Sequence, residues 1–231
     1  MLKEAMKQLW ETYREAGWIP EPEAKAFFRS GGLAVPRFQT ASDREGALAA
    51  GEAIGYPVAA KVVSLDVVHK TEAGGVKVGI ADATELAETY DRFALLPGFR
   101  EVLVEEMLSG TEVIIGAKVD VQFGCVVLVG IGGTGVEVYE DTTIRMAPLE
   151  AEEAGAMLDR LRGNRLLRGF RGAPPVDREA LQHTLATFSR MALEVEGYIE
   201  SIDLNPVMCT PDGCTIADAR IMLSKRGEGR R

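Results

Sequence analysis

The pattern of hydrophobic and polar positions along the chain predicts alternating helices and strands. Apolar residues at helical spacing are typical of amphipathic helices, and short Val-rich runs bounded by turn formers are typical of strands. Helices are predicted at Leu2–Ala16, Pro22–Phe28, Asp43–Ile54, Thr84–Phe93, Glu150–Leu161, Leu166–Arg171 and Asp177–Glu196. Strands are predicted at Leu33–Phe38, Pro57–Val63, Val76–Ile80, Glu101–Met107, Thr111–Val119, Cys125–Ile131, Glu137–Tyr139, Thr142–Met146, Tyr198–Leu204 and Cys214–Leu223. This order is typical of a mixed α/β fold.

Short polar side chains mark the start of three of the predicted helices. Ser42, with Glu45 as its capping-box partner, is predicted to cap the third helix. Thr84 is predicted to cap the fourth helix and Asp177 the longest one.

Composition and charge narrow the classes of partner. A chain of 231 residues is one large domain or two small lobes, and its net charge of −9 disfavours nucleic acid and anionic membranes as partners. The three cysteines are odd in number and lack metal-site spacing, which indicates free thiols in a reducing compartment. No apolar run reaches the length of a membrane span, and the N-terminus lacks a signal-peptide pattern. A cytoplasmic location is therefore expected.

The segment from Pro57 to Ile80 combines two predicted strands with a polar loop. Lys61 lies in the first strand, where a buried ammonium group needs an anionic partner. The loop contains His69 and the pair Gly74–Gly75, and glycines let backbone N–H groups approach an anion closely. A nucleotide phosphate fits these features. An ordinary polar hairpin loop with a lysine that reaches solvent explains the same segment, and the loop is not a Walker A motif.

Acidic residues and glycines near the middle of the chain form two further candidates. Glu106, Met107 and Leu108 end an apolar strand where the backbone could meet an adenine edge, and Glu112 follows on the next strand. The cluster Gly130–Gly135 could expose backbone N–H groups to a phosphate. Solvated acids at a strand end and an ordinary flexible turn are the alternatives.

Charged residues interrupt apolar strands in the C-terminal half. Arg145 lies within the run IRMAPL, where a guanidinium group needs a fixed anion unless the strand is a solvent-exposed edge. The two closing strands carry Glu200, Asp203, Asn205 and Asp218 among apolar residues, although acids are statistically depleted in strands. Hard oxygen ligands on adjacent strands suit Mg²⁺ with bound phosphates, so these strands are interpreted as a metal site.

Taken together, these segments resemble an ATP-grasp domain of the kind found in the β subunit of ADP-forming acyl-CoA synthetases. The matching stretches follow the family's order from about Glu21 to Leu223. They are GYPVAAKVVSLDVVHKTEAGGVKVGI, VEEMLSGTEVIIGAKVDVQFG, VVLVGIGGTGVEVYEDTTIRMAPL, LLRGFRGAPP and IESIDLNPV followed by DGCTIADARIML. The last of these, with its D-x-N-P and D-A-R patterns, is also similar to succinyl-CoA synthetase β chains.

The resemblance implies a two-lobed ATP-grasp fold of mixed α/β class, with the nucleotide between the lobes. It divides the chain into an N-terminal helical extension (1–20), an N-terminal lobe (21–108), a C-terminal lobe (109–224) and a basic tail (225–231), which we expect to be disordered.

The resemblance also assigns roles to the candidate residues. Lys61, together with the loop glycines Gly74 and Gly75, would contact the phosphates of ATP or ADP. The backbone at Glu106, Met107 and Leu108 would bind the adenine, and Glu112 the ribose.

The metal and the transferred phosphate are assigned in the same way. Asn205 and Asp218 would hold Mg²⁺, and Arg145 would bind phosphates. Asp203 lies where the succinyl enzymes carry a glutamate near the incoming phosphohistidine, and His69 belongs to a motif implicated in phosphate relay.

The implied reaction converts acyl-CoA, ADP and phosphate into acid, CoA and ATP through an acyl phosphate and a phosphohistidine. A separate α subunit in a hetero-oligomer would supply the CoA and acyl sites, with Trp10 and Trp18 as part of the contact. Two alternatives remain at this point. The chain could be a stand-alone ATP-grasp carboxylate ligase, or a nucleotide-sensing regulatory module.

Overall fold

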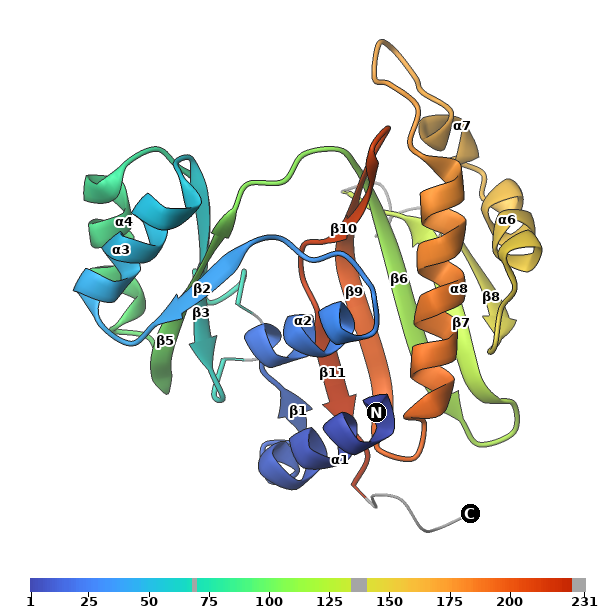
Figure 1. The fold of residues 1–231 in the computed structure, drawn as a ribbon, viewed down its shortest axis with the longest axis horizontal. Coiled ribbons are helices and arrows are strands. Elements are labelled where there is room, and N and C mark those ends of the chain that lie inside the picture. The colour runs from blue at the N-terminus through green and yellow to red at the C-terminus, as the bar shows by residue number, and fades with distance from the viewer. Residues whose placement is uncertain (68–69, 134–140, 226–231) are drawn as a thin grey trace. The chain divides into compact units, whose positions relative to one another are not determined.

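The computed structural model describes residues 1–67, 70–133 and 141–225 of the chain. Two compact units are present, one formed by Met1–Val35 with Ser109–Arg231 and the other by Pro36–Leu108 (Figure 1). Each unit combines an antiparallel sheet with helices, which confirms the predicted mixed α/β class. The predicted strand Glu137–Tyr139 lies outside the described residues, as does the tail from residue 226.

The described helices and strands follow the predicted order closely. The helices are α1 (Leu2–Tyr13), α2 (Glu21–Ser30), α3 (Arg44–Ile54), α4 (Ala83–Phe93), α6 (Ala151–Arg160), α7 (Asn164–Leu167) and α8 (Arg178–Glu194). The strands are β1 (Trp18–Ile19), β2 (Phe38–Ala41), β3 (Val58–Ser64), β4 (Val76–Ile80), β5 (Phe99–Glu106), β6 (Thr111–Asp120), β7 (Gly124–Ile131), β8 (Thr142–Met146), β9 (Ile199–Thr210), β10 (Gly213–Ile216) and β11 (Arg220–Leu223).

The larger unit is built on a seven-stranded sheet. Its strands run in the order β1-β11-β9-β6-β7-β8, and β10 pairs with β9 beside this path. Along β6, Val113 and Ile115 are buried in the hydrophobic core, whereas Glu112 and Gly116 fall on the opposite face because successive side chains alternate. The sheet therefore has one core face and one face that can carry polar residues.

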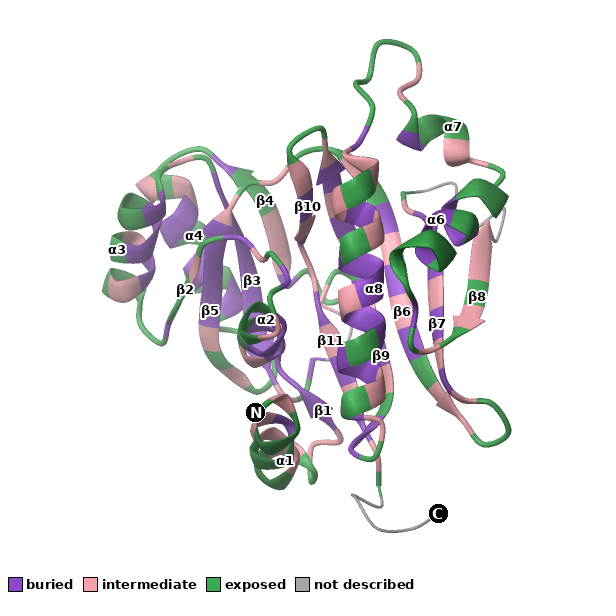
Figure 2. Cartoon of the chain, turned by 45° about the vertical axis from the view of Figure 1, so that its right-hand side comes forward, coloured by how far each residue is buried: buried purple, intermediate pink, exposed green. Residues whose placement is uncertain are grey.

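Helices α1, α2, α6 and α8 contribute apolar side chains to the core of this unit. The rings of Phe28 in α2 and Phe188 in α8 pack with centroids 6.1 Å apart, and Met157 of α6 belongs to the same cluster. In Figure 2, α8 shows buried residues toward the sheet and exposed residues on its outer side. Figure 2 thus shows the amphipathic pattern predicted for this helix from the sequence.

The N-terminal 35 residues pack on the larger unit, which differs from the predicted boundary at Glu21. Met6 is fully buried, and the indole N–H of Trp10 donates to the backbone oxygen of Ser224 at 2.9 Å. Trp18 lies in β1, which pairs with β11, and its side chain is buried. The prediction that Trp18 contacts a partner is therefore wrong, because this side chain fills the core of its own unit.

The smaller unit has a four-stranded sheet in the order β2-β5-β3-β4. Helices α3 and α4 pack on one face of this sheet, against Ala60 and Val62 of β3 and Val104 of β5. Lys61 and Glu105 occupy the opposite face, because each neighbours one of these core positions along its strand.

Two predicted helix caps are corrected by the structure. Asp43 caps α3 by accepting from the backbone N–H of Gly46 at 2.7 Å, and Asp82 caps α4 by accepting from Glu85 at 2.9 Å. The predictions of Ser42 and Thr84 are wrong by one and two residues, because several capping residues stand side by side in each segment. The predicted cap of α8 by Asp177 is confirmed.

Two strand predictions also change. The short strand predicted at Leu33–Phe38 lies instead at Phe38–Ala41, after Pro36, which cannot donate a ladder hydrogen bond. The closing strand predicted at Cys214–Leu223 is divided into β10 and β11. The division occurs where the N–H groups of Ala217 and Asp218 both donate to the backbone oxygen of Pro206. Among the described helices, none has the length and apolar character needed to cross a membrane.

Candidate functional site

Lys61 is buried and paired with a carboxylate on the neighbouring strand. Its Nζ lies 2.8 Å from Oε1 of Glu105, and the two side chains are only 8% and 5% exposed. Lys61 is directly opposite Leu103 in the β3–β5 ladder, so Glu105 reaches it from two residues farther along the same face. The sequence predicted that Lys61 needs an anionic partner, and the structure shows that Glu105 is one.

The glycine pair of the loop between β3 and β4 is folded into a turn. The N–H of Gly74 donates to the backbone oxygen of Thr71 at 3.1 Å, and that of Gly75 to Lys70 at 2.7 Å. Gly74 has a φ of 69°, in the left-handed region that favours glycine. A Cβ on Gly75 would approach Cγ1 of Val62 to 2.4 Å, so this position requires glycine for close packing on β3. In this arrangement both N–H groups are already used within the loop. His69 lies outside the described residues.

The end of β5 is held by an arginine from the segment before β2. Glu106 accepts from the backbone N–H of Arg37 at 2.9 Å and from its Nε at 2.8 Å, and its own N–H donates to the Arg37 backbone oxygen. Burial raises the pKa of Glu106, but the hydrogen bonds and charge of Arg37 outweigh burial and leave the pKa below its usual range. Met107 and Leu108 follow the strand beyond its ladder with β3, and the Met107 sulfur accepts from the N–H of Gly79 at 3.2 Å.

Three of the predicted residues of the larger unit lie in β9 or in the turn between β10 and β11. Asp203 in β9 lies directly opposite Arg220 in β11 and Gly116 in β6. Asn205 follows two residues later in β9 and is exposed. The backbone N–H of Asp218 donates to the oxygen of Pro206 at 3.4 Å, so Asp218 lies close to the residue that follows Asn205. Asp218 also raises the pKa of Asp203, so the two carboxyl groups are near enough to interact.

Arg220 lies in the D-A-R pattern, but no role was predicted for it from the sequence. Its Nη2 lies 3.6 Å from Oδ2 of Asp203, and its Nε is buried with no hydrogen-bond partner in the described part of the chain. Burial raises the pKa of Asp203, Arg220 lowers it and Asp218 raises it further, so the carboxyl group has a pKa above its usual range. A buried guanidinium N–H without a partner is a donor that an anionic ligand could satisfy.

Glu112 lies beside the second glycine cluster. The N–H of Gly132 donates to the Glu112 backbone oxygen at 2.7 Å, and a Cβ on Gly132 would approach Cβ of Glu112 to 2.7 Å. A Cβ on Gly133, whose φ is 86°, would lie 3.5 Å from Oε2 of Glu112. Glu112 and the glycine cluster, which are separate candidates in the sequence, therefore lie next to each other in the structure. The rest of the GIGGTG segment, from Thr134, lies outside the described residues.

Arg145 lies apart from this group. It is directly opposite Val127 in the β7–β8 ladder, and Val127 belongs to the core covered by the helices. Asp203 is on the other face, since its β6 partner Gly116 alternates with the core residues Ile115 and Ala117. Arg145 and Asp203 therefore lie on opposite faces of the sheet. The sequence alone could not show this, because it does not contain the pairing register of the strands.

The donor set of the β9–β11 region fits Mg²⁺ in the presence of phosphates. Asp218 offers a carboxylate, one oxygen of which accepts from the N–H of Ala219 at 2.9 Å, and Asn205 offers an amide oxygen. In the described ranges no group of three or more His, Cys, Asp or Glu side chains could hold a metal. A site with one or two protein carboxylates is typical of Mg²⁺ that completes its coordination with water and substrate phosphates.

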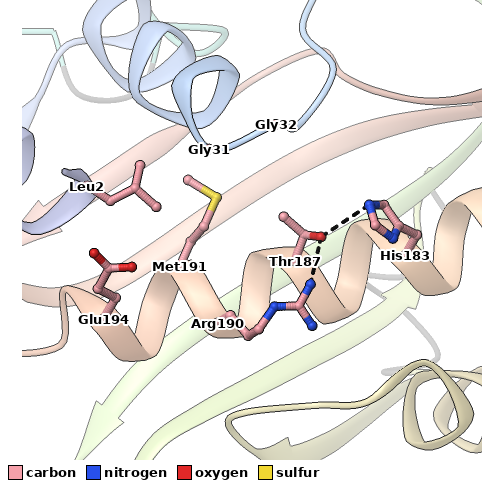
Figure 3. A pocket seen from close by; sticks show the side chains of 8 residues that line it. All are labelled: Leu2, Gly31, Gly32, His183, Thr187, Arg190, Met191 and Glu194. Carbon is pink, nitrogen blue, oxygen red and sulfur yellow. Dashed lines mark hydrogen bonds between the residues drawn. The ribbon is translucent and has the colours of Figure 1, made fainter.

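A separate pocket of about 390 Å³ lies between α8 and the N-terminal segment of the larger unit (Figure 3). Figure 3 shows Thr187 hydrogen-bonded to both His183 and Arg190 on one side, with Met191 and Leu2 nearby. This pocket contains none of the residues predicted from the sequence, so its presence does not bear on the nucleotide assignment.

Comparison with known proteins gives the family. A profile described as an ATP-grasp domain matches residues 12–223. The chain belongs to the ATP-grasp family. It is 37% identical over 215 residues to the acetate–CoA ligase [ADP-forming] I subunit beta of Pyrococcus furiosus, an alignment that covers 89% of this chain and 91% of that subunit.

The chain is also similar to a longer relative and to a solved structure. It is 33% identical over 231 residues to acetate–CoA ligase [ADP-forming] I of Archaeoglobus fulgidus, covering 96% of this chain but about a third (34%) of the relative. Among solved structures, it is similar to acetyl-coenzyme A synthetase 1 of Ca. Korarchaeum cryptofilum, with a TM-score of 0.83 and 37% identity. That match covers 95% of this chain and 100% of the other, which was solved with coenzyme A and Mg-AMPPCP, its phosphohistidine segment pointing towards the nucleotide binding site. These matches confirm the predicted ATP-grasp fold.

The buried pair of Lys61 and Glu105 yields a stability prediction. Replacing Glu105 by alanine removes the carboxylate that lies 2.8 Å from the buried Lys61 ammonium group, and we expect it to lower the free energy of unfolding by about 3 kcal/mol or more. The double variant Lys61→Met, Glu105→Leu should recover most of this loss, because no charge is then buried. Urea unfolding followed by circular dichroism measures both.

Glu101→Ala is the matched control for this prediction. Glu101 lies on the same strand, has no ion pair among the described residues, and its replacement should change stability by no more than about 0.5 kcal/mol. A Glu105→Ala variant as stable as Glu101→Ala would show that the pair contributes nothing.

Proposed function

We propose that this chain is the nucleotide-binding β subunit of an ADP-forming acyl-CoA synthetase. It exchanges a phosphoryl group between ADP or ATP and a phosphohistidine, within the overall conversion of acyl-CoA, ADP and phosphate into acid, CoA and ATP. The observation that carries the proposal is the position of Asp203 and Asn205 in β9, with Asp218 in the turn that donates to the backbone oxygen of Pro206. The near full-length similarity to a β subunit supports the same function.

The residues that bind the nucleotide in this proposal are those named by the sequence resemblance. Lys61 contacts phosphates, the backbone at Glu106, Met107 and Leu108 binds the adenine, and Glu112 binds the ribose. Glu105 holds the Lys61 ammonium group in place and offsets the cost of burying it. Gly74 and Gly75 shape the adjoining loop through their backbone conformation and close packing.

The β9–β11 cluster provides the charges for phosphoryl transfer. Asn205 and Asp218 would hold Mg²⁺, which when bound neutralises charge on the phosphates. Asp203 would lie near the incoming phosphohistidine, and Arg220, whose Nε has no hydrogen-bond partner among the described residues, would donate to the phosphoryl group. Such a reaction depends mainly on positioning and charge stabilisation. Arg145 is left out of this set because it occupies the other face of the sheet.

We also propose that a separate α subunit carries the CoA and acyl sites. The Archaeoglobus relative, of which this chain matches 34%, is a single chain that has room for further domains beyond the matching part. The solved Korarchaeum synthetase was crystallised with coenzyme A as well as a nucleotide analogue. Both observations support a division of the reaction between this ATP-grasp part and another part of the enzyme.

The metal assignment predicts a specific loss of nucleotide binding. Asp218→Ala should weaken binding of Mg²⁺–ADP by about tenfold or more, because a site with few carboxylates loses one of its ligands. Isothermal titration calorimetry on the folded variant measures the change. Asp212→Ala, in the exposed turn between β9 and β10, is the control and should bind as the wild type does. Unchanged Mg²⁺–ADP affinity in folded Asp218→Ala would remove Asp218 from the metal site.

His69 is proposed to take the phosphoryl group transiently, on the basis of its lysine- and glycine-rich sequence surroundings. ATP labelled on the γ-phosphate should leave an acid-labile, base-stable label on the assembled enzyme. His69→Asn should abolish the label on this chain and reduce turnover. His183→Asn is the control, since His183 is the only other histidine and is exposed on α8. Full turnover by His69→Asn would reduce His69 to a structural role.

A further inference from the structure

Two of the three cysteines face each other across a hairpin. Cys209 in β9 and Cys214 in β10 are direct partners in the antiparallel ladder, joined by the turn at Pro211 and Asp212 (Figure 1). Both side chains are buried, at 1% and 7% exposure, and the Cys209 thiol donates to the backbone oxygen of Val207 at 4.0 Å. Cys125 lies on β7, paired with Val119 at the other end of β6 from the Cys209 pairing.

The geometry of this pair is close to that of a disulfide. Directly opposite residues of antiparallel strands have Cβ atoms about 4.5–5.5 Å apart. A disulfide requires about 3.5–4.5 Å between the same atoms, so a shift of roughly 1 Å is sufficient. Both cysteines lie next to a two-residue turn, where the strands can adjust more easily than in the centre of the sheet.

We propose that Cys209 and Cys214 form an oxidisable thiol pair that closes into a disulfide across the β9–β10 hairpin. The oxidant is a small-molecule disulfide. The Cys214 thiolate attacks one of its sulfur atoms, forming a mixed disulfide and releasing one thiolate. Cys209 then loses its proton and attacks the Cys214 sulfur, which releases the second thiolate. Two protein thiols are oxidised and one disulfide is reduced to two thiols.

The pKa of Cys209 and the exposure of Cys214 indicate which thiol attacks the small-molecule disulfide first. The hydrogen bond with Cys214 and burial raise the pKa of Cys209, so its thiol retains its proton. Cys214 is the more exposed of the two side chains, so it is the one that a small-molecule disulfide reaches first. Burial raises the pKa of Cys125 to about 11, and in the described structure no other cysteine is its ladder partner. Cys125 is therefore expected to stay reduced.

The same hairpin is flanked by the two proposed metal ligands, so closing the disulfide should affect Mg²⁺ binding. This expected effect rests on the proposed function. Asn205 precedes Cys209 in β9, and Asp218 follows Cys214, with Val207 and Ile216 paired between them. Drawing the strands together at the cysteines alters the spacing of the two ligands. Mg²⁺ tolerates little departure from octahedral geometry, so the disulfide should lower the affinity for Mg²⁺–ADP by about threefold or more.

The first experiment counts thiols and is independent of nucleotide binding. The reduced, folded chain is incubated with oxidised glutathione at pH about 8.5, where thiolates are populated, and then alkylated under denaturing conditions. Intact mass should show three alkyl groups before oxidation and one after it, with the loss of two hydrogen atoms and a Cys209–Cys214 cross-linked peptide. Three alkyl groups after prolonged oxidation, or only glutathione adducts, would overturn the proposal.

Single cysteine variants identify the pair. Cys125→Ser should still form the internal disulfide, whereas Cys209→Ser should form none and accept at most a glutathione adduct on Cys214. An internal disulfide in Cys209→Ser would show that another pairing is responsible.

Calorimetry with Mg²⁺–ADP on the reduced and oxidised chain then tests the consequence. An unchanged affinity would overturn the coupling between the hairpin and the site. If neither form binds the nucleotide, the proposed function fails, whereas the thiol count still decides whether the disulfide forms.

Discussion

The antiparallel pairing of β6 with β9 is the constraint on which the larger unit depends. It places Gly116 beside Asp203 and Glu112 opposite Met208, while Ile115 and Leu204 enter the core. Since the side-chain period of a strand is two, a shift of one residue would turn the acids into the core and the aliphatic residues out. The register that stabilises the fold is therefore the same register that assembles the polar cluster. The sheet cannot lose one without losing the other.

The second constraint is that a buried charged group needs a compensating partner. The two units differ in how they provide one. Lys61 is almost fully buried and has Glu105 at 2.8 Å, so its charge is compensated within the protein. Arg220 has only a longer contact with Asp203, at 3.6 Å, and a buried Nε without a partner in the described residues. A site that leaves a guanidinium donor unsatisfied is prepared for an anion. This asymmetry favours phosphoryl chemistry at β9–β11 and a positioning role for Glu105.

Much of the fold could be predicted from the sequence, because most strands and helices have clear periodicity and strong caps such as Asp177. The sequence also drew attention to Asp203, Asn205 and Asp218, because polar residues interrupt apolar strands there. The features that the sequence analysis missed depend on how the strands pair, and a local sequence pattern does not contain this information. The register puts Arg145 on the helix-covered face, joins Glu105 to Lys61 and sets Cys209 opposite Cys214. The caps at Asp43 and Asp82 were missed because neighbouring residues were equally suitable.

The central claim is that this chain performs the nucleotide half of an acyl-CoA synthetase reaction and depends on a second polypeptide for the other half. The most direct test is ATP formation from ADP, phosphate and a panel of acyl-CoAs. The chain purified alone should form no ATP above background, and the native complex isolated with its partner should form it at enzymatic rates. Robust ATP formation by the chain alone would contradict the claim and identify a stand-alone ATP-grasp ligase.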